Sequence, residues 1–236
     1  MDSIGENGAD VGDRQLKSEM FDQLASVGKA LANGKRLELL ELLAQGERGV
    51  DALAQAAGLG LSTASAHLQL LRRAGLVVTR REGTSIHYRL AGWDVARLLQ
   101  SLCTIAESHA PAVEKARAAY LNTRPHPAHD APEISRQELM NMADDAAVTV
   151  LDVRPEEEYA AAHIPGALSI PVEELAARIA EVPAGRQVVA YCRGAYCVLA
   201  YEAADTLHAA GRPARRLHGG MLEWRANDLP TESSAA

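Results

Sequence analysis

Two cysteines, Cys192 and Cys197, lie in the part of the sequence that is best suited to nucleophilic chemistry. The apolar run 188–191 leads directly into Cys192, and a helical pattern of alanine and leucine follows Cys197. A short loop between a strand and a helix N-terminus can point its backbone N–H groups inward, which stabilises a thiolate relative to the free pKa of about 8.5. We therefore expect Cys192 to be a nucleophile that takes up sulfur and carries it as a persulfide.

The residues after Cys192 form the expected active-site loop. Gly194 lets the backbone curl, and Arg193 would attract an anion if its side chain faced the mouth of the site. Cys197 either resolves a persulfide on Cys192 into a disulfide or polysulfide bridge, or is a small packed residue at the helix start. Related loops bind tetrahedral anions, so arsenate reduction and phosphatase chemistry are lower-ranked alternatives. The full set of loop residues is Arg193, Gly194, Ala195, Tyr196 and Cys197.

Short apolar runs must position this loop. Residues 148–153 and 187–191 have the composition of buried strands, and each is followed by a turn or loop and a helical pattern. This alternation indicates an α/β domain. Asp152 and Arg154 flank the end of the first strand, where we expect them to order the site.

The first half of the chain is mainly helical and contains one strand pair. Strands are predicted at 76–81 and 85–90, and Glu82-Gly83-Thr84 between them indicates a hairpin. Apolar residues at three- and four-residue spacing predict helices over 14–31, 35–44, 51–57, 62–74 and 94–120. The helices 51–57 and 62–74, joined by a short turn, have the layout of a helix-turn-helix.

The second helix of this motif is expected to read DNA. Its N-terminus would be capped by the Ser62 hydroxyl, and Leu68, Leu70 and Leu71 would pack it onto the first helix. Small polar groups near a helix N-terminus suit a major groove, and arginines beside them suit phosphates. The candidate DNA contacts are Ser62, Thr63, Ser65, His67, Gln69, Arg72, Arg80 and Arg81.

Charge and composition bound the function. The chain carries a net charge of −7, yet residues 14–121 hold 14 Lys and Arg against 10 Asp and Glu, so a local basic patch is available for phosphate contact. No run reaches the roughly 20 apolar residues of a membrane helix, and the acidic start is unlike a secretion signal. Three cysteines do not make a disulfide framework, and we expect a cytoplasmic protein with free thiols.

A proline-rich break divides the chain. Residues 122–132 hold three prolines and no hydrophobic periodicity, which is typical of a linker. The expected organisation is a disordered N-terminal tail at 1–13, a DNA-binding domain at 14–121, the linker, an α/β domain at 133–230 and a C-terminal tail at 231–236.

The run from Leu31 through Leu90 resembles the ArsR/SmtB family of winged-helix repressors, and the resemblance covers about residues 16–120. It implies homodimers joined by their first and last helices and a roughly palindromic double-stranded operator. Many relatives release DNA on binding metal, but Asp94, Cys103, Glu107, His109 and Glu114 lack a compact ligand spacing, so no metal site is assigned. Cys103 is instead either a sulfur-sensing thiol or a small buried side chain.

Four motifs in the second half resemble single-domain rhodaneses over about residues 133–230. They are Leu151–Arg154, His163–Ala167, Tyr191–Gly194 and His218–Trp224. The resemblance implies a parallel sheet, Cys192 as the persulfide-forming nucleophile and structural roles for His163 and Trp224. Cys197 departs from the commonest rhodanese loops, where a hydroxyl or basic residue is usual.

Together these features predict two domains, a mainly α winged helix-turn-helix and an α/β rhodanese-like domain with a parallel sheet. The predicted function is a repressor whose operator binding responds to reactive sulfur, taken from a small donor such as thiosulfate or a persulfide without any cofactor. The first alternative is a sulfurtransferase that uses the helical domain mainly for dimerisation. A metal- or arsenic-responsive repressor with an arsenate-reductase-like loop ranks below it.

Overall fold

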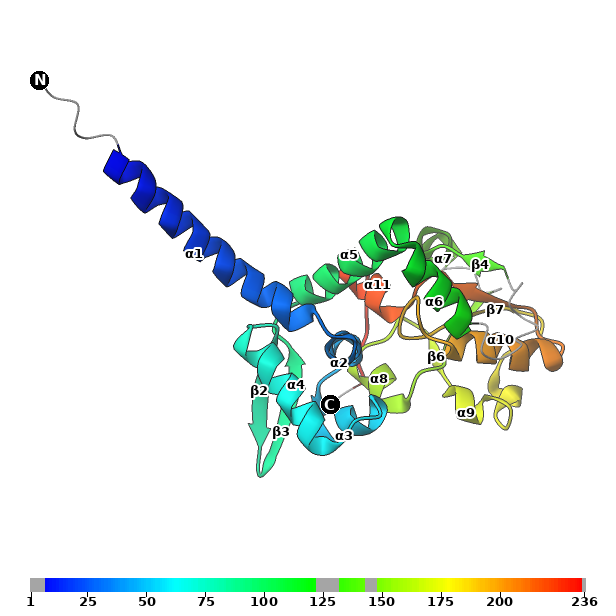
Figure 1. Cartoon of the computed structure of the whole chain (residues 1–236). Helices are drawn as coiled ribbons and strands as arrows, with labels where there is room; N and C mark the ends of the chain where they lie inside the picture. The colour runs from blue at the N-terminus through cyan, green and yellow to red at the C-terminus, as the bar shows by residue number, and fades with distance from the viewer. Residues whose placement is uncertain (1–6, 122–131, 143–147, 235–236) are drawn as a thin grey trace, which may run out of the picture. The chain divides into compact units, whose positions relative to one another are not determined.

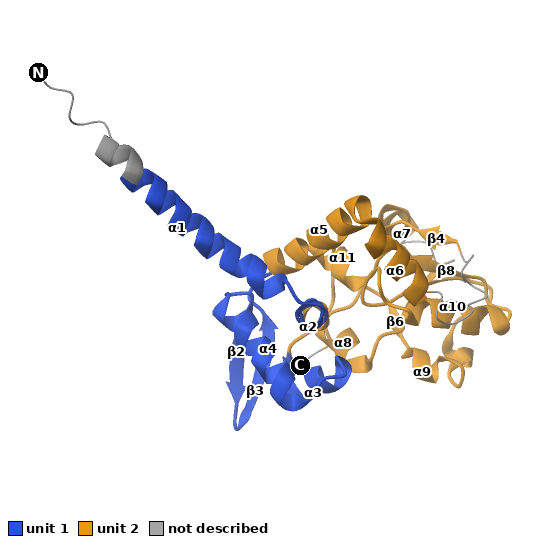
Figure 2. Ribbon diagram, in the orientation of Figure 1, with its two compact units in different colours: residues 1–40, 48–92 blue, residues 41–47, 93–236 orange. Residues whose placement is uncertain are grey.

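The computed structural model describes residues 7–121, 132–142 and 148–234 (Figure 1). The chain divides into two compact units, residues 1–40 with 48–92 and residues 41–47 with 93–236 (Figure 2). The division passes through one helix, α2 (Gly34–Gln45). The domain bounds predicted from the sequence therefore stay a prediction, and most of the predicted linker lies outside the described residues.

The first unit has the predicted winged helix-turn-helix architecture. Its three-stranded antiparallel sheet has the order β1-β3-β2. The helix α1 begins at Asn7, before the predicted start at residue 14. The elements are α1 (Asn7–Leu31), the first part of α2, β1 (Arg48–Gly49), α3 (Val50–Ala56), α4 (Leu61–Arg73), β2 (Val77–Glu82) and β3 (Ser85–Leu90).

Two details of α4 differ from the prediction. The N-cap is Gly60 in extended backbone and no side chain caps the helix, so the expectation that Ser62 is the cap is wrong. Leu68 and Leu71 are fully buried, as expected, but Leu70 is 44% exposed. Residues three apart share one helix face, whereas Leu70 lies two residues from Leu68 and points elsewhere.

The wing hairpin is tighter than its sequence suggested. Glu82 pairs with Ser85, so only Gly83 and Thr84 form the turn. Gly83 has φ +59°, a conformation that two-residue hairpins require and that a residue without a side chain adopts at no steric cost. The first strand thus extends through Glu82, past the predicted end at Arg81.

The second unit contains two helices where one was predicted. The expected helix 94–120 is divided into α5 (Trp93–His109) and α6 (Pro111–Leu121). Pro111 has no N–H to donate to the preceding turn, so α5 stops before it, and its fixed φ suits the first position of α6.

The α/β part of this unit confirms the predicted parallel sheet, whose strand order is β4-β8-β7-β5-β6. The strands are β4 (Glu133–Ile134), β5 (Val148–Asp152), β6 (Leu168–Ser169), β7 (Gln187–Tyr191) and β8 (Ala214–Leu217). The helices are α7 (Arg136–Met142), α8 (Glu156–Ala161), α9 (Val172–Leu175), the 3-10 turn Ile179–Glu181, α10 (Leu199–Ala209) and α11 (Met221–Ala226).

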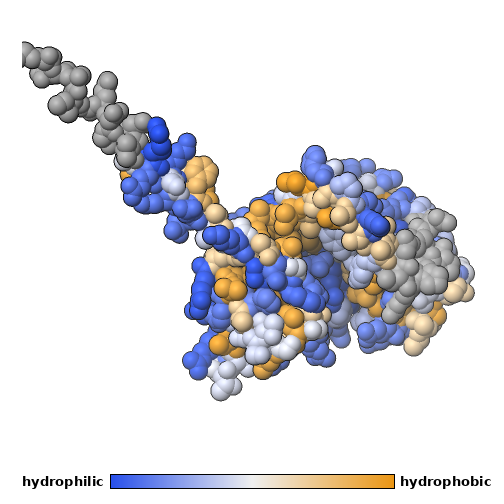
Figure 3. Space-filling model, in the orientation of Figure 1, coloured by the Kyte–Doolittle hydropathy of each residue, from blue (hydrophilic) through white to orange (hydrophobic). Residues whose placement is uncertain are grey.

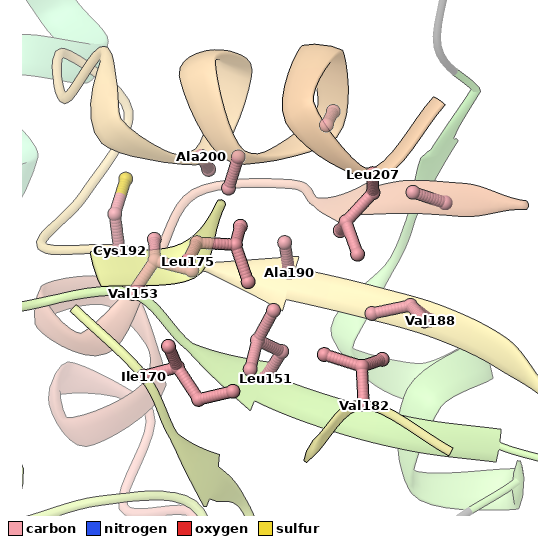
Figure 4. Close-up of a cluster of buried hydrophobic side chains, with 13 residues drawn as sticks. Leu151, Val153, Ile170, Leu175, Val182, Val188, Ala190, Cys192, Ala200 and Leu207 are labelled. Carbon is pink, nitrogen blue, oxygen red and sulfur yellow. The ribbon is translucent and has the colours of Figure 1, made fainter. Parts of the chain in front are cut away.

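Alternate residues of β7 face two different cores. Val188, Ala190 and Cys192 belong to the cluster that includes Ala200 and Leu207 of α10 (Figure 4). Val189 and Tyr191 belong to the cluster that includes Leu139 of α7 and Trp224 of α11. Since successive side chains of a strand point to opposite faces, this buried sheet needs apolar residues on both. Cys192 therefore directly follows a strand that is buried on both faces.

The end of the described chain is held by hydrogen bonds. His163 and Glu232 exchange both backbone N–H···O bonds, at 2.9 Å each. Trp224 is buried and its indole N–H donates to the Pro230 carbonyl at 2.7 Å, which agrees with the packing role expected from the sequence. Within the described residues, no helix combines the length and apolar character that crossing a membrane requires.

Candidate functional site

Cys192 lies at the carboxyl end of β7 and is 1% exposed. Its sulfur points toward the start of α10 (Figure 4). The thiol is 3.5 Å from the Cys197 carbonyl oxygen and 3.9 Å from that of Gly194. The loop thus brings the two predicted cysteines together at a helix N-terminus.

The ionisation of this pair differs from the sequence expectation. Burial, followed by the neighbouring Cys197, raises the pKa of the Cys192 thiol well above its ordinary value. The hydrogen bond from Cys192 lowers the pKa of Cys197, and backbone N–H groups of Arg193 and Leu199 add to that effect. In this arrangement desolvation of Cys192 outweighs the N–H groups of the loop, which is opposite to the expected stabilisation of its thiolate. Of the two thiols, Cys197 is the one whose pKa is lowered.

Asp152 and Arg154 form a buried ion pair beside the site. The Arg154 guanidinium donates to both Asp152 oxygens, to the Ala162 carbonyl at 2.8 Å and to the Gln45 amide oxygen at 3.1 Å. The Tyr191 hydroxyl donates to Asp152 at 2.6 Å. This network fixes the residue before Cys192 and does not contact the sulfur directly.

Replacing Arg154 with methionine should lower the free energy of unfolding by about 3–5 kcal/mol, because it leaves the buried Asp152 carboxylate unpaired. Urea denaturation followed by tryptophan fluorescence measures this loss, since Trp93 and Trp224 both lie in the second unit. Arg178→Met is the control: its ion pairs with Glu174 and Glu181 are exposed, so the free energy of unfolding should change far less than in Arg154→Met. Equal losses would contradict the assigned role of Arg154.

Arg193 does not face the site. Its guanidinium donates to both oxygens of the fully buried Glu158 carboxylate, at 2.6 to 3.0 Å. The Gln45 amide donates weakly to the Arg193 carbonyl, at 3.4 Å. The conditional role of Arg193 as an anion-attracting group is therefore not fulfilled in this structure, and the residue anchors the loop.

Glu223 anchors the loop by hydrogen bonds, and this role was not predicted from the sequence. Its carboxylate accepts the N–H groups of Gly220 at 2.7 Å and Ala195 at 3.3 Å, and burial raises its pKa. A Cβ atom at Gly220 would lie 2.4 Å from the Cys192 carbonyl, so only glycine fits there. Glutamate three residues after the N-cap of a helix is a recognisable capping pattern that could have indicated this contact.

Tyr196 connects the loop to α5. Its hydroxyl donates to Glu107 at 2.8 Å and lies near enough to Cys103 to affect the pKa of that thiol. Burial raises the pKa of Cys103, and burial followed by Glu107 raises that of Tyr196. The structure thus places the candidate sensor thiol beside the active-site loop, on the helix that follows the wing after two residues.

The candidate DNA contacts differ in accessibility. Gln69 is partly buried and donates to the Tyr88 hydroxyl at 3.1 Å, which ties it to the wing sheet. Ser65 and His67 are half-buried. The exposed candidates are Ser62, Thr63, Arg72, Arg80 and Arg81. Among the described residues, no group of three or more His, Cys, Asp or Glu is arranged to hold a metal ion.

Two family models match different parts of the chain, and one relative matches nearly all of it. Residues 33–79 match the model of bacterial regulatory proteins of the arsR family, and residues 135–227 match that of rhodanese-like domains. The HTH-type transcriptional regulator Rv0324 of Mycobacterium tuberculosis is 51% identical over 224 residues, which is 95% of this chain and 96% of that protein.

Two further relatives each cover one half. A sulfurtransferase of Allochromatium vinosum is 34% identical over 100 residues, 42% of this chain and 92% of its own length. The solution structure of the homodimeric winged helix-turn-helix DNA-binding domain of Mb0332 from Mycobacterium bovis is 50% identical, covers 47% of this chain and 94% of that one, and superposes with a TM-score of 0.38.

Proposed function

Since this chain belongs to the ArsR family of transcriptional regulators and carries a rhodanese-like domain, we propose that it is a repressor whose operator binding changes when sulfur is bound at Cys192. The observation that carries the proposal is the Tyr196–Glu107 hydrogen bond, which joins the loop of Cys192 to α5. Because Tyr196 lies between Cys192 and Cys197 in the loop, a change at either sulfur moves the residue that contacts this helix.

The sulfur transfer uses the two cysteines in sequence. Cys197 takes the proton of the Cys192 thiol, and the Cys192 sulfur attacks the outer sulfur of thiosulfate. The S–S bond of thiosulfate breaks, sulfite leaves with the bonding electrons, and Cys192 keeps the transferred sulfur as a persulfide. The two cysteines lie in one loop, with the Cys192 thiol 3.5 Å from the Cys197 carbonyl oxygen, and this proximity supports the proton transfer.

Cys197 has a second use in this scheme. Cys197 can then give the proton that it took to the outer sulfur of the persulfide and attack the Cys192 sulfur, which forms a Cys192–Cys197 disulfide and releases the outer sulfur as hydrosulfide. The loop then has three states, namely thiol, persulfide and disulfide. The alternative, in which Cys197 only packs at the start of α10, predicts the first two.

The DNA side of the proposal rests on α4, the wing and a dimer. Ser62, Thr63 and Arg72 of α4 are exposed for groove and phosphate contacts, as are Arg80 and Arg81 of the wing. Exposed apolar side chains line α1 and α5 separately (Figure 3), and such stripes support homodimerisation. They are Leu16, Met20, Phe21 and Leu24 on α1 and Leu98, Leu102 and Ile105 on α5.

Titration of an operator tests the proposal. A duplex selected from random DNA by the full chain is labelled and titrated with protein before and after treatment with a persulfide donor. The dissociation constant should change by about 5–150-fold, the usual range of coupling between two sites. The Cys192→Ser protein, treated identically, should show no change.

The outcomes separate the proposal from its alternative. If the wild-type protein binds the operator with the same dissociation constant before and after treatment with the persulfide donor, the proposed response is contradicted. Sulfur transfer without any selected operator would favour a sulfurtransferase that uses the helical part for dimerisation.

A further inference from the structure

A small cavity next to Cys192 is lined by cationic side chains that have no role in the sulfur transfer described above. Its volume is about 20 Å³, and its lining includes Cys192, Arg117, Arg216, His218 and Glu133. One water-sized molecule needs about 10–15 Å³ by such a measure. The cavity therefore has room for little more than one donor atom beside the Cys192 sulfur. The rest of the donor must lie next to the arginine side chains.

Arg216 of β8 is buried, and not all of its N–H groups are hydrogen-bonded. The residue is 6% exposed, and its Nε has no hydrogen-bond partner among the described residues. Its Nη1 lies 3.1 Å from Glu133, and its guanidinium stacks 3.6 Å from the Tyr201 ring centre. A buried N–H without a partner costs free energy, which an incoming acceptor would recover.

Arg117 of α6 is the second cation at the cavity. Its Nε is also without a hydrogen-bond partner in the described part of the chain. Among the described residues, the nearest carboxylate oxygens, of Glu107 and Glu114, lie 3.9 and 3.6 Å from its guanidinium nitrogens. These separations exceed hydrogen-bond length, so the guanidinium keeps donors for a ligand.

The N–H donors left unpaired in the described part of the lining favour an anion. Among the described residues of the lining, Glu133 is the one carboxylate, and it contacts both Arg216 at 3.1 Å and His218 Nδ1 at 2.8 Å. Because Cys197, whose pKa is lowered, also lines the cavity, the attraction for an anion rests on the unpaired Nε groups of Arg117 and Arg216 rather than on an excess of positive charge. The Arg193 guanidinium, which would have attracted an anion only if it faced the mouth of the site, is bound to Glu158.

We propose that Arg117 and Arg216 form the subsite for the anionic part of the sulfur donor, with Arg117 supplied by a helix outside the rhodanese-like match. The inference rests on the proposed function, because it concerns the donor of the same cysteine. The transferred sulfur enters the cavity, and the anionic leaving group stays between the two guanidinium groups. Since α6 completes this subsite, residues 135–227 alone would lack part of it.

The test compares two alkylating reagents that differ in charge, iodoacetate and iodoacetamide. The rate at which each reagent labels the Cys192 sulfur of the full chain is measured, and the ratio of the two rates reports how strongly the site attracts an anion. Tryptic cleavage after Arg193 places Cys192 and Cys197 in different peptides, so mass spectrometry follows Cys192 alone. The measurement uses one pH and near-physiological ionic strength.

Arg117→Gln and Arg216→Gln should each lower this ratio by about fivefold, the attraction of two unit charges roughly 4 Å apart in a water-like dielectric. In turnover assays the KM for thiosulfate should rise by a similar factor while kcat is kept. Arg215→Gln is the matched control, because it removes the same charge one residue away on the opposite side of the strand and does not line the cavity.

Arg117→Gln keeps the proposal falsifiable if the buried Arg216 variant does not fold, because Arg117 lies on a partly exposed helix. An unchanged alkylation ratio in the folded Arg117→Gln protein would overturn the subsite, whether or not sulfur is transferred. A lowered ratio in a protein that transfers no sulfur would keep the anion subsite and reject the proposed sulfur chemistry. The two failures are thus distinguishable.

Discussion

Replacing Cys192 with serine will reduce sulfur transfer from thiosulfate to cyanide by about three orders of magnitude or more. A serine hydroxyl at this position cannot hold the transferred sulfur as a persulfide, so the two-step route disappears rather than slows. The substitution is nearly isosteric in a site that is 1% exposed, so the fold should be kept. Turnover is measured as thiocyanate formation under excess thiosulfate.

The loaded intermediate gives a second readout of the same prediction. After thiosulfate treatment, the peptide that ends at Arg193 should gain the mass of one sulfur atom in the wild-type chain and none in Cys192→Ser. Cys197→Ser serves as the matched control, because it removes the neighbouring thiol and leaves the carrier. Sulfur found on Cys197 in place of Cys192 would reverse the assignment of the nucleophile.

The same control separates the two roles left open for Cys197. If Cys197 resolves the persulfide, then Cys197→Ser should accumulate loaded Cys192, and the wild-type chain should show a Cys192–Cys197 disulfide. Its lowered pKa, due first to the hydrogen bond from Cys192, makes it the readier thiolate of the pair. Identical loading in both proteins would leave Cys197 as a packing residue.

The architecture could be predicted from the sequence because local patterns determine it. The strand-loop-helix around Cys192, the α4 pattern and the wing strands each lie within a few residues of one another, and their periodicity indicates the fold directly. Where the prediction failed, a single local feature was overlooked. Pro111 ends α5, and the two-residue offset of Leu70 from Leu68 takes it off the buried face.

The surroundings of Cys192 could not be predicted in the same way. Gln45, Glu107 and Arg117 come from helices far earlier in the chain, and only tertiary packing brings them to the loop or its neighbours. The order of the two cysteine pKa values is likewise decided by burial, which no loop motif encodes. Glu223 is the exception, since its capping pattern is local.

Replacing Tyr196 with phenylalanine should separate sulfur chemistry from the DNA response. The substitution removes only the hydroxyl, which donates to Glu107 at 2.8 Å and contacts Cys103, and it leaves the loop backbone around Cys192 unchanged. Thiosulfate turnover should stay within about threefold of the wild-type value. The sulfur-induced change in operator affinity should fall from the expected 5–150-fold to near unity, because the hydrogen bond that transmits about 1–3 kcal/mol of coupling free energy is absent.

Tyr159→Phe is the matched control for this variant. Its hydroxyl donates to the Ala167 carbonyl at 2.9 Å within the α/β domain, so the same chemical change there should leave the DNA response intact. Glu107→Ala should reproduce the Tyr196→Phe result, and the double variant should lose no more than either single one, because both remove the same interaction. A Tyr196→Phe protein that keeps the full response would exclude this hydrogen bond as the route.

Reciprocity supplies an independent check on that route. If sulfur on the loop changes operator affinity by a given factor, operator DNA must change the equilibrium affinity of the loop for sulfur by the same factor. Loading of Cys192, measured by mass spectrometry in a persulfide buffer with and without saturating operator, should therefore shift in the wild-type chain. It should not shift in Tyr196→Phe, and a shift that survives there would place the coupling elsewhere in the packing of α5.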